Sequence, residues 1–99
     1  MPSKPRGRRV TDDKVPGGSY MATESARVVR KRLEASIEHR VTIPVTDDND
    51  KIIALTVHVI SVSRTTAACR FTDDRSLIVM LGGEKDEDKP PVILLDKLI

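Results

Sequence analysis

The feature that most constrains the fold of this chain is its longest β-like run, Lys51 to Ser63. Hydrophobic residues alternate with small or polar ones as far as Val59, which is the period of a strand with one buried face. The alternation then shifts by one residue, and Ile60 and Val62 become the hydrophobic positions. Such a shift turns every later side chain to the other face unless a β-bulge absorbs it. We therefore expect one long strand with a bulge or bend near Val59, as a small barrel requires. Two shorter strands, or one strand with a single exposed isoleucine, are the alternatives.

Four other stretches predict strands, and one predicts a helix. Ser19 to His39 has hydrophobic residues three and four apart, which is the spacing of an amphipathic helix. Pro44 has no N–H to donate, so its strand should lie at a sheet edge or pair on one side only at that point. Leu77 to Leu81 is hydrophobic throughout and predicts a strand buried on both faces. The further strands are expected at residues 40–46, 67–72, 77–81 and 92–99, with a short helix as the alternative for the last.

These elements predict an α+β protein with one small domain, because 99 residues suffice for one domain and no more. Residues 1–18 are basic and rich in proline and glycine, and they predict a flexible arm. Residues 19–99 predict one amphipathic helix followed by a five-stranded, mostly antiparallel meander. The meander should close into a small barrel or a curled sheet, with the helix across one opening. A helix followed by five short strands resembles SH3-like and Sm-like barrels in outline.

Charge is distributed unevenly along the chain. Residues 1–40 carry ten Lys/Arg and five Asp/Glu, whereas residues 41–99 carry seven and ten. This asymmetry predicts an anionic partner for the basic half, or attraction between copies of the chain. The alternatives are a solubilising tail, a solvated helix face and a solvated loop. The candidate residues for binding nucleic acid or another partner are Lys4, Arg6, Arg8, Arg9 and Lys14 of the arm and Arg27 and Lys31 of the helix, and the candidate acidic docking loop contains Glu84, Asp86, Glu87 and Asp88.

The sequence contains no recognisable arrangement of catalytic or metal-binding residues. His39 and His58 are the only histidines, and neither has neighbours at the spacing of metal ligands. Cys69 lies in the hydrophobic phase of its strand and His58 in the polar phase, so a buried thiol is expected rather than a Cys–His nucleophile pair. The three Thr-Asp-Asp triplets predict turns, and no phosphate-binding glycine loop is present. We therefore expect no metal, no cofactor, no small-molecule substrate and no enzymatic activity.

The preferred functional hypothesis is a non-enzymatic interaction subunit of a larger assembly, a class that includes small viral structural or accessory proteins. Its partners would be other proteins, copies of itself, or nucleic acid reached by the arm. One alternative is a nucleic-acid-binding regulator whose binding is phosphate-led and salt-sensitive, since Tyr20 and Phe71 are the only aromatic residues. Another is an inhibitor that docks on a host protein. The sequence shows no membrane-spanning stretch and no secretory signal, which favours the cytoplasm or a virion.

Overall fold

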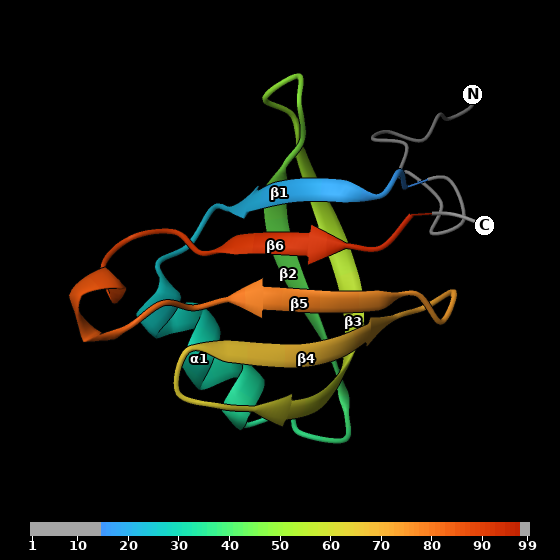
Figure 1. Ribbon diagram of the computed structural model, residues 1–99. Coiled ribbons are helices and arrows are strands. Elements are labelled where there is room, and N and C mark those ends of the chain that lie inside the picture. The colour runs from blue at the N-terminus through green and yellow to red at the C-terminus, as the bar shows by residue number, and fades with distance from the viewer. Residues whose placement is uncertain (1–14, 98–99) are drawn as a thin grey trace, which may run out of the picture.

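The computed structural model describes residues 15–97, which form a closed antiparallel barrel with one α-helix (Figure 1). Neighbouring strands follow chain order, and β1 pairs with β6 to close the barrel. The predicted small antiparallel barrel is therefore confirmed, but the prediction of five strands is wrong, because there are six. The strands are β1 (Gly18–Ala22), β2 (Arg40–Thr46), β3 (Ile52–Val62), β4 (Thr66–Phe71), β5 (Ser76–Met80) and β6 (Val92–Leu95), the helix is α1 (Ala26–Glu34), and a 3-10 turn, η2, spans Glu84–Asp86.

The missing strand lies where the sequence predicts the start of the helix. Residues 19–22 belong to β1, which pairs with β6 along its length and with β2 at its end. Tyr20 and Ala22 are buried while Ser19 and Met21 are exposed, which is the period of a strand. Ala22 fits the hydrophobic phase of both a strand and a helix, and this ambiguity is why the helix is predicted too long.

Helix α1 is short because capping and turn geometry limit it at both ends. The hydroxyl of Ser25 accepts a hydrogen bond from the Val28 N–H at 3.4 Å, as an N-cap residue does. Beyond the helix, Glu38 has a left-handed φ of 70°, which turns the chain into β2. Ile37, one of the hydrophobic residues of the helix predicted over residues 19–39, is 41% exposed in this connection.

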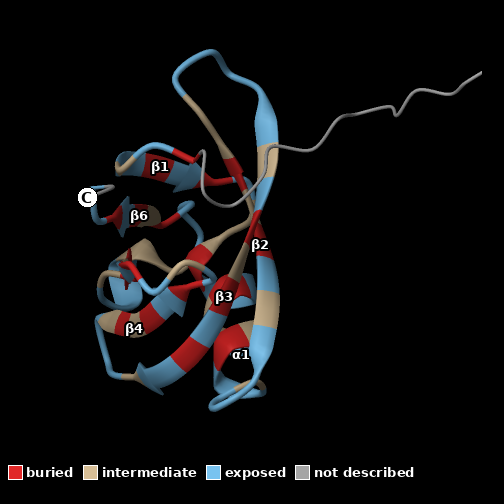
Figure 2. Ribbon diagram, turned by 90° about the vertical axis from the view of Figure 1, so that its right-hand side faces the viewer, coloured by how far each residue is buried: buried red, intermediate tan, exposed pale blue. Residues whose placement is uncertain are grey.

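The predicted bulge in the long strand is confirmed. Val59 pairs with Cys69 of β4, but the next pair is Ser61 with Ala68, so Ile60 is the extra residue. Its side chain is 44% exposed, whereas Val59 is fully buried and Val62 packs against the core. The bulge thus absorbs the phase shift, and buried residues alternate with exposed ones along β3 and β4 (Figure 2).

Pro44 of β2 has a paired residue on β3 but none on β1, as predicted. It lies opposite Ala54 of β3, and its carbonyl accepts a hydrogen bond from Thr23 on the other side, at 3.0 Å. Strand β1 ends at Ala22, which pairs with Val45, so the β1–β2 ladder does not reach Pro44. The N–H that proline lacks is therefore not needed for that ladder.

Two predictions about the last strands need correction. Strand β5 is not buried on both faces: Leu77 and Val79 are buried, but Ile78 is half-buried and Met80 is 43% exposed. Residues 92–95 form a strand, as predicted, but this strand stops at Leu95 and does not continue to residue 99. Both strands have one solvent-facing side because the barrel has a single interior.

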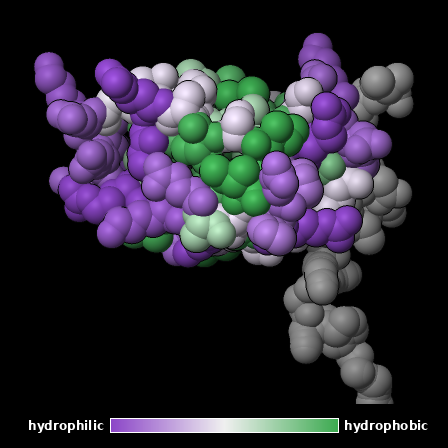
Figure 3. All heavy atoms as spheres, turned by 90° about the horizontal axis from the view of Figure 1, so that it is seen from below, coloured by the Kyte–Doolittle hydropathy of each residue, from purple (hydrophilic) through white to green (hydrophobic). Residues whose placement is uncertain are grey.

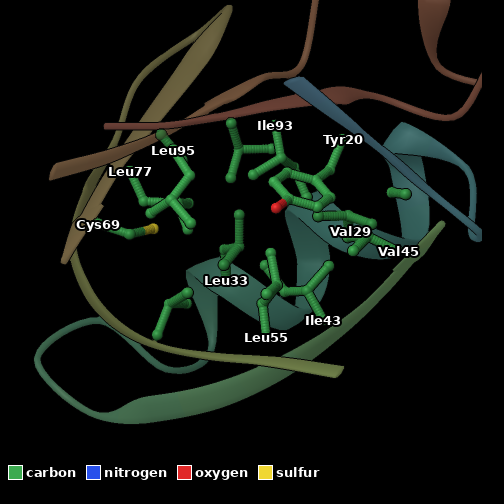
Figure 4. Packing of buried hydrophobic residues seen from close by; sticks show 14 of the residues in the cluster. Tyr20, Val29, Leu33, Ile43, Val45, Leu55, Cys69, Leu77, Ile93 and Leu95 are labelled. Atoms are coloured by element: carbon green, nitrogen blue, oxygen red, sulfur yellow. The ribbon is translucent and has the colours of Figure 1, made fainter. Parts of the chain in front are cut away.

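The core fills the barrel and includes one face of α1. Helix α1 packs against β2 and β3, and Val29 and Leu33 are fully buried. Figure 4 shows these two side chains meeting Ile43, Leu55 and Ile93 from the strands. Val15 is also buried in this core, so the residues immediately before β1 pack on the barrel.

Candidate functional site

Two surfaces that the sequence predicts as separate binding sites contact each other. The guanidinium of Arg27 on α1 lies 3.0 Å from Oε1 of Glu87 and 3.0 Å from Oδ1 of Asp88. Backbone hydrogen bonds join the same segments, from the Ala26 N–H to the Lys89 carbonyl at 2.8 Å and from the Arg27 N–H to the Glu87 carbonyl at 2.9 Å. The hydrogen bond to Glu87, with the charge of Asp88, raises the pKa of Arg27. The acidic loop therefore caps the first turn of α1 and neutralises Arg27.

The other described site residues bind within the acidic loop or face solvent. The carboxylate of Asp86 accepts a hydrogen bond from the Gly83 N–H and lies 3.6 Å from the Lys89 ammonium. Glu84 and Lys31 are exposed. The arm residues Lys4, Arg6, Arg8, Arg9 and Lys14 lie outside the described residues.

The two remaining arginines of α1 serve the fold. Arg32 donates to both carboxylate oxygens of Glu24, at 2.5 and 2.8 Å, and this pair lowers the pKa of Glu24. Arg30 donates to the Ser63 and Arg64 carbonyls in the β3–β4 turn. The predicted basic helix face is thus reduced to Lys31, because the other cations bind groups of the same chain.

A surface that the sequence does not predict runs around the outside of the barrel. One cross-strand row crosses β3, β4, β5, β6 and β1, and the adjacent row crosses β4, β5, β6, β1 and β2. We call the two rows together the neutral belt. Their outward-facing side chains are all uncharged, in a protein in which 32% of residues are charged. The first row contains Ser61, Ala68, Ile78, Leu94 and Ser19, and the second contains Thr66, Met80, Val92, Met21 and Thr46.

The neutral belt contains three of the exposed large hydrophobic residues of the protein. Met21 is 45% exposed, Met80 43% and Leu94 40%. Exposed Ile60 adjoins the belt at the β3 bulge. Figure 3 views the molecule from the side of α1 and the end of β3, and shows hydrophobic side chains gathered in the middle of that face with hydrophilic ones around them. Along the belt itself, the outward-facing residues of both rows carry no charge.

A second unpredicted feature is a row of basic side chains at one end of the barrel. Arg40 of β2 pairs with His58 of β3, and His58 pairs with Arg70 of β4. Their side chains line a groove of about 240 Å³ together with Phe71, Thr72 and Asp74. The three basic residues come from three strands, so only the strand register reveals that they form a row.

The prediction that Cys69 faces the core and His58 faces outward is confirmed. Cys69 is buried, while His58, on the neighbouring strand, is exposed on the outer face. Burial raises the pKa of the Cys69 thiol to about 11, so the thiolate is disfavoured at neutral pH. Within residues 15–97, no cluster of His, Cys, Asp and Glu side chains has an arrangement that could hold a metal ion.

Arg75 is the one charged side chain buried among the described residues. Its guanidinium donates to the Asp73 carboxylate at 2.8 Å and to the Asp96 carbonyl at 3.1 Å, and it stacks over Phe71. These contacts tie the β4–β5 turn to the end of β6, and they give Arg75 a structural role.

In the part of the chain that the structure describes, no helix is long and apolar enough to cross a membrane. Comparison with protein-family models, with curated proteins and with solved structures finds no match for this chain.

Proposed function

We propose that this protein is a non-enzymatic assembly subunit that associates with a second copy of itself through the neutral belt. The single observation that carries the proposal is the exclusion of charge from the belt, although charged residues make up 32% of the chain. Depletion of charged residues is the compositional mark of an interface centre, and contiguous exposed apolar surface marks a contact site. Met21 and Met80 add flexible side chains that adapt to a facing surface.

The closed barrel decides the kind of contact. Each strand has two neighbours in the barrel, and β1 and β6 pair with each other. Most strand edges among the described residues are therefore paired, although residues 52–56 of β3 extend beyond the pairing with β4. Across the belt, β4, β5, β6 and β1 are paired on both sides, so a partner there packs face to face on the outer side chains.

Charge favours a second copy as the occupant. Two identical neutral surfaces meet without repulsion, and a two-fold axis across the belt runs the two barrels antiparallel. The uncharged belts of the two copies then exclude water from the contact between them.

Sedimentation equilibrium over a range of concentrations tests the proposal with two matched variants. Leu94→Glu places a charge in the belt, and Val28→Glu places the same charge at an exposed apolar residue of α1; these side chains are 40% and 43% exposed. We expect a dimer for the wild type and for Val28→Glu, and a monomer for Leu94→Glu. The proposal would be wrong if the wild type stays monomeric at high concentration, or if the two substitutions change the monomer–dimer equilibrium equally.

A further inference from the structure

The basic row has a defined geometry. Arg40, His58 and Arg70 occupy directly paired positions on three adjacent strands. Neighbouring strands lie about 4.8 Å apart, so the row spans about 10 Å across the outer face of the barrel. All three side chains are exposed and line the same groove. A line of donors of this length can contact neighbouring phosphates of one extended chain.

The cations of the row are available to an anion. None of the ion pairs among residues 15–97 involves Arg40 or Arg70. Arg70 donates one hydrogen bond, from Nη1 to the Asp74 backbone carbonyl at 3.2 Å. The other N–H donors of its guanidinium remain available to a ligand. Asp74 also supplies the one carboxylate among the residues that line the groove. The groove therefore carries an excess of positive charge that Asp74 only partly offsets.

The row lies at the end of the barrel where the described chain begins. Gly18 pairs with Leu95, Leu95 with Leu77, and Leu77 with Cys69, the neighbour of Arg70. Figure 1 shows the start of β1 and the β4–β5 turn on the same side of the molecule. The described chain therefore begins at the end of the barrel that carries the row.

We propose that the groove of Arg40, His58 and Arg70 binds the phosphodiester backbone of nucleic acid. Guanidinium forks match phosphate oxygens, and His58 adds an N–H donor between them. A linear polyanion fits the row better than a phosphopeptide does, because the row runs across the strands and both His58 and Arg70 are paired on both sides, which leaves no strand edge there for a peptide backbone. Phe71 is buried, so the groove has no aromatic platform, and binding does not depend on base sequence. This proposal stands on the row alone and does not require the neutral belt.

The test measures binding of the full chain to mixed-sequence single-stranded and duplex oligonucleotides, by fluorescence anisotropy, over a series of salt concentrations. Arg40→Ala and Arg70→Ala should each weaken binding about three- to tenfold at low salt and reduce the salt slope by roughly one. Lys51→Ala, at the other end of β3, is the matched control and should change neither quantity by that much. Asp74→Asn removes the carboxylate of the groove and should tighten binding.

Three results would overturn the proposal. One is wild-type affinity in both Arg40→Ala and Arg70→Ala with loss of binding only in the triple variant R6A/R8A/R9A, since the arm would then be the sole contact. Another is equal weakening by Lys51→Ala, which would indicate an effect of net charge. The third is binding to anionic lipid vesicles or to a phosphopeptide without binding to either oligonucleotide. Circular dichroism of each variant distinguishes lost binding from lost folding.

Discussion

The Arg27 guanidinium and the Glu87 carboxylate lie 3.0 Å apart and join α1 to the loop between β5 and β6. The basic helix face and the acidic loop, which look like two binding surfaces in the sequence, are thus partners within one chain. The two residues are sixty positions apart in the sequence. They meet because β5, which leads into the loop, and β1, which leads into α1, end at the same end of the barrel. The neutral belt and the basic row take no part in this ion pair.

The Arg27 pair should have only a small, salt-dependent effect on stability. Both side chains are partly exposed, and ion pairs of this kind are screened by salt. We expect Arg27→Ala to lower the melting temperature slightly at low salt and not at high salt. Lys31→Ala, on the same helix, is the control and should have no salt-dependent effect. A large loss of stability at high salt would mean that the loop is held by the pair and not by its backbone hydrogen bonds.

The bulge in β3 predicts opposite sensitivities at two successive residues. Val59 is fully buried, and Val59→Ala should cost about 2 kcal/mol, from lost burial and the cavity left behind. Ile60 is the exposed extra residue, and Ile60→Ala should change stability by less than about 0.5 kcal/mol. Urea unfolding of both variants measures the difference. Comparable costs at the two positions would contradict the register.

The pair of Glu24 and Arg32 predicts part of the acid sensitivity. The hydrogen bond from Arg32 lowers the pKa of Glu24 in the folded state. A lowered pKa gives stability that is present above the ordinary carboxyl pKa, about 4.3, and is lost as the pH falls through the folded value. Glu24→Gln should therefore be less stable than the wild type at pH 7 and should approach it at acid pH. Glu38→Gln is the control, and a gap that stays constant with pH would rule out the linkage.

The buried thiol predicts slow chemical modification. Burial raises the pKa of Cys69 to about 11, so a thiol reagent should react at neutral pH only after the protein unfolds. The same shift makes stability fall as the pH rises from about 8.5, where an unfolded thiol ionises, toward 11. Labelling kinetics in increasing urea measure this protection. A Ser61→Cys variant supplies an exposed thiol for comparison, and equally fast labelling of Cys69 in the native wild type would contradict its placement.

The sequence predicts local structure well where one period dominates. Strand β2 has the predicted bounds because its alternation lies between a turn of Asp and Asn residues and a change of period. The bulge at Ile60 is predicted because a phase shift is visible within one strand. Strand β1 is missed because Ala22 fits both a helix and a strand, and only pairing with β6 decides between them.

Neither open surface can be predicted from the sequence alone. Leu94 and Met21 of the neutral belt belong to strands at opposite ends of the chain, and β1 itself is not predicted. Arg40, His58 and Arg70 become a row only through the register of two strand pairs. Register follows from turn lengths and packing in the closed barrel, which no single stretch of sequence contains.

The most direct test of the neutral belt as the contact between copies is an isotope-filtered NOE experiment on a mixture of labelled and unlabelled protein. The account predicts contacts between copies from the methyl groups of Met21, Met80 and Leu94, and none from Ile37 in the α1–β2 connection. Absence of any contact between copies at a concentration of about 1 mM, or contacts that involve Ile37 and not the belt, would contradict it.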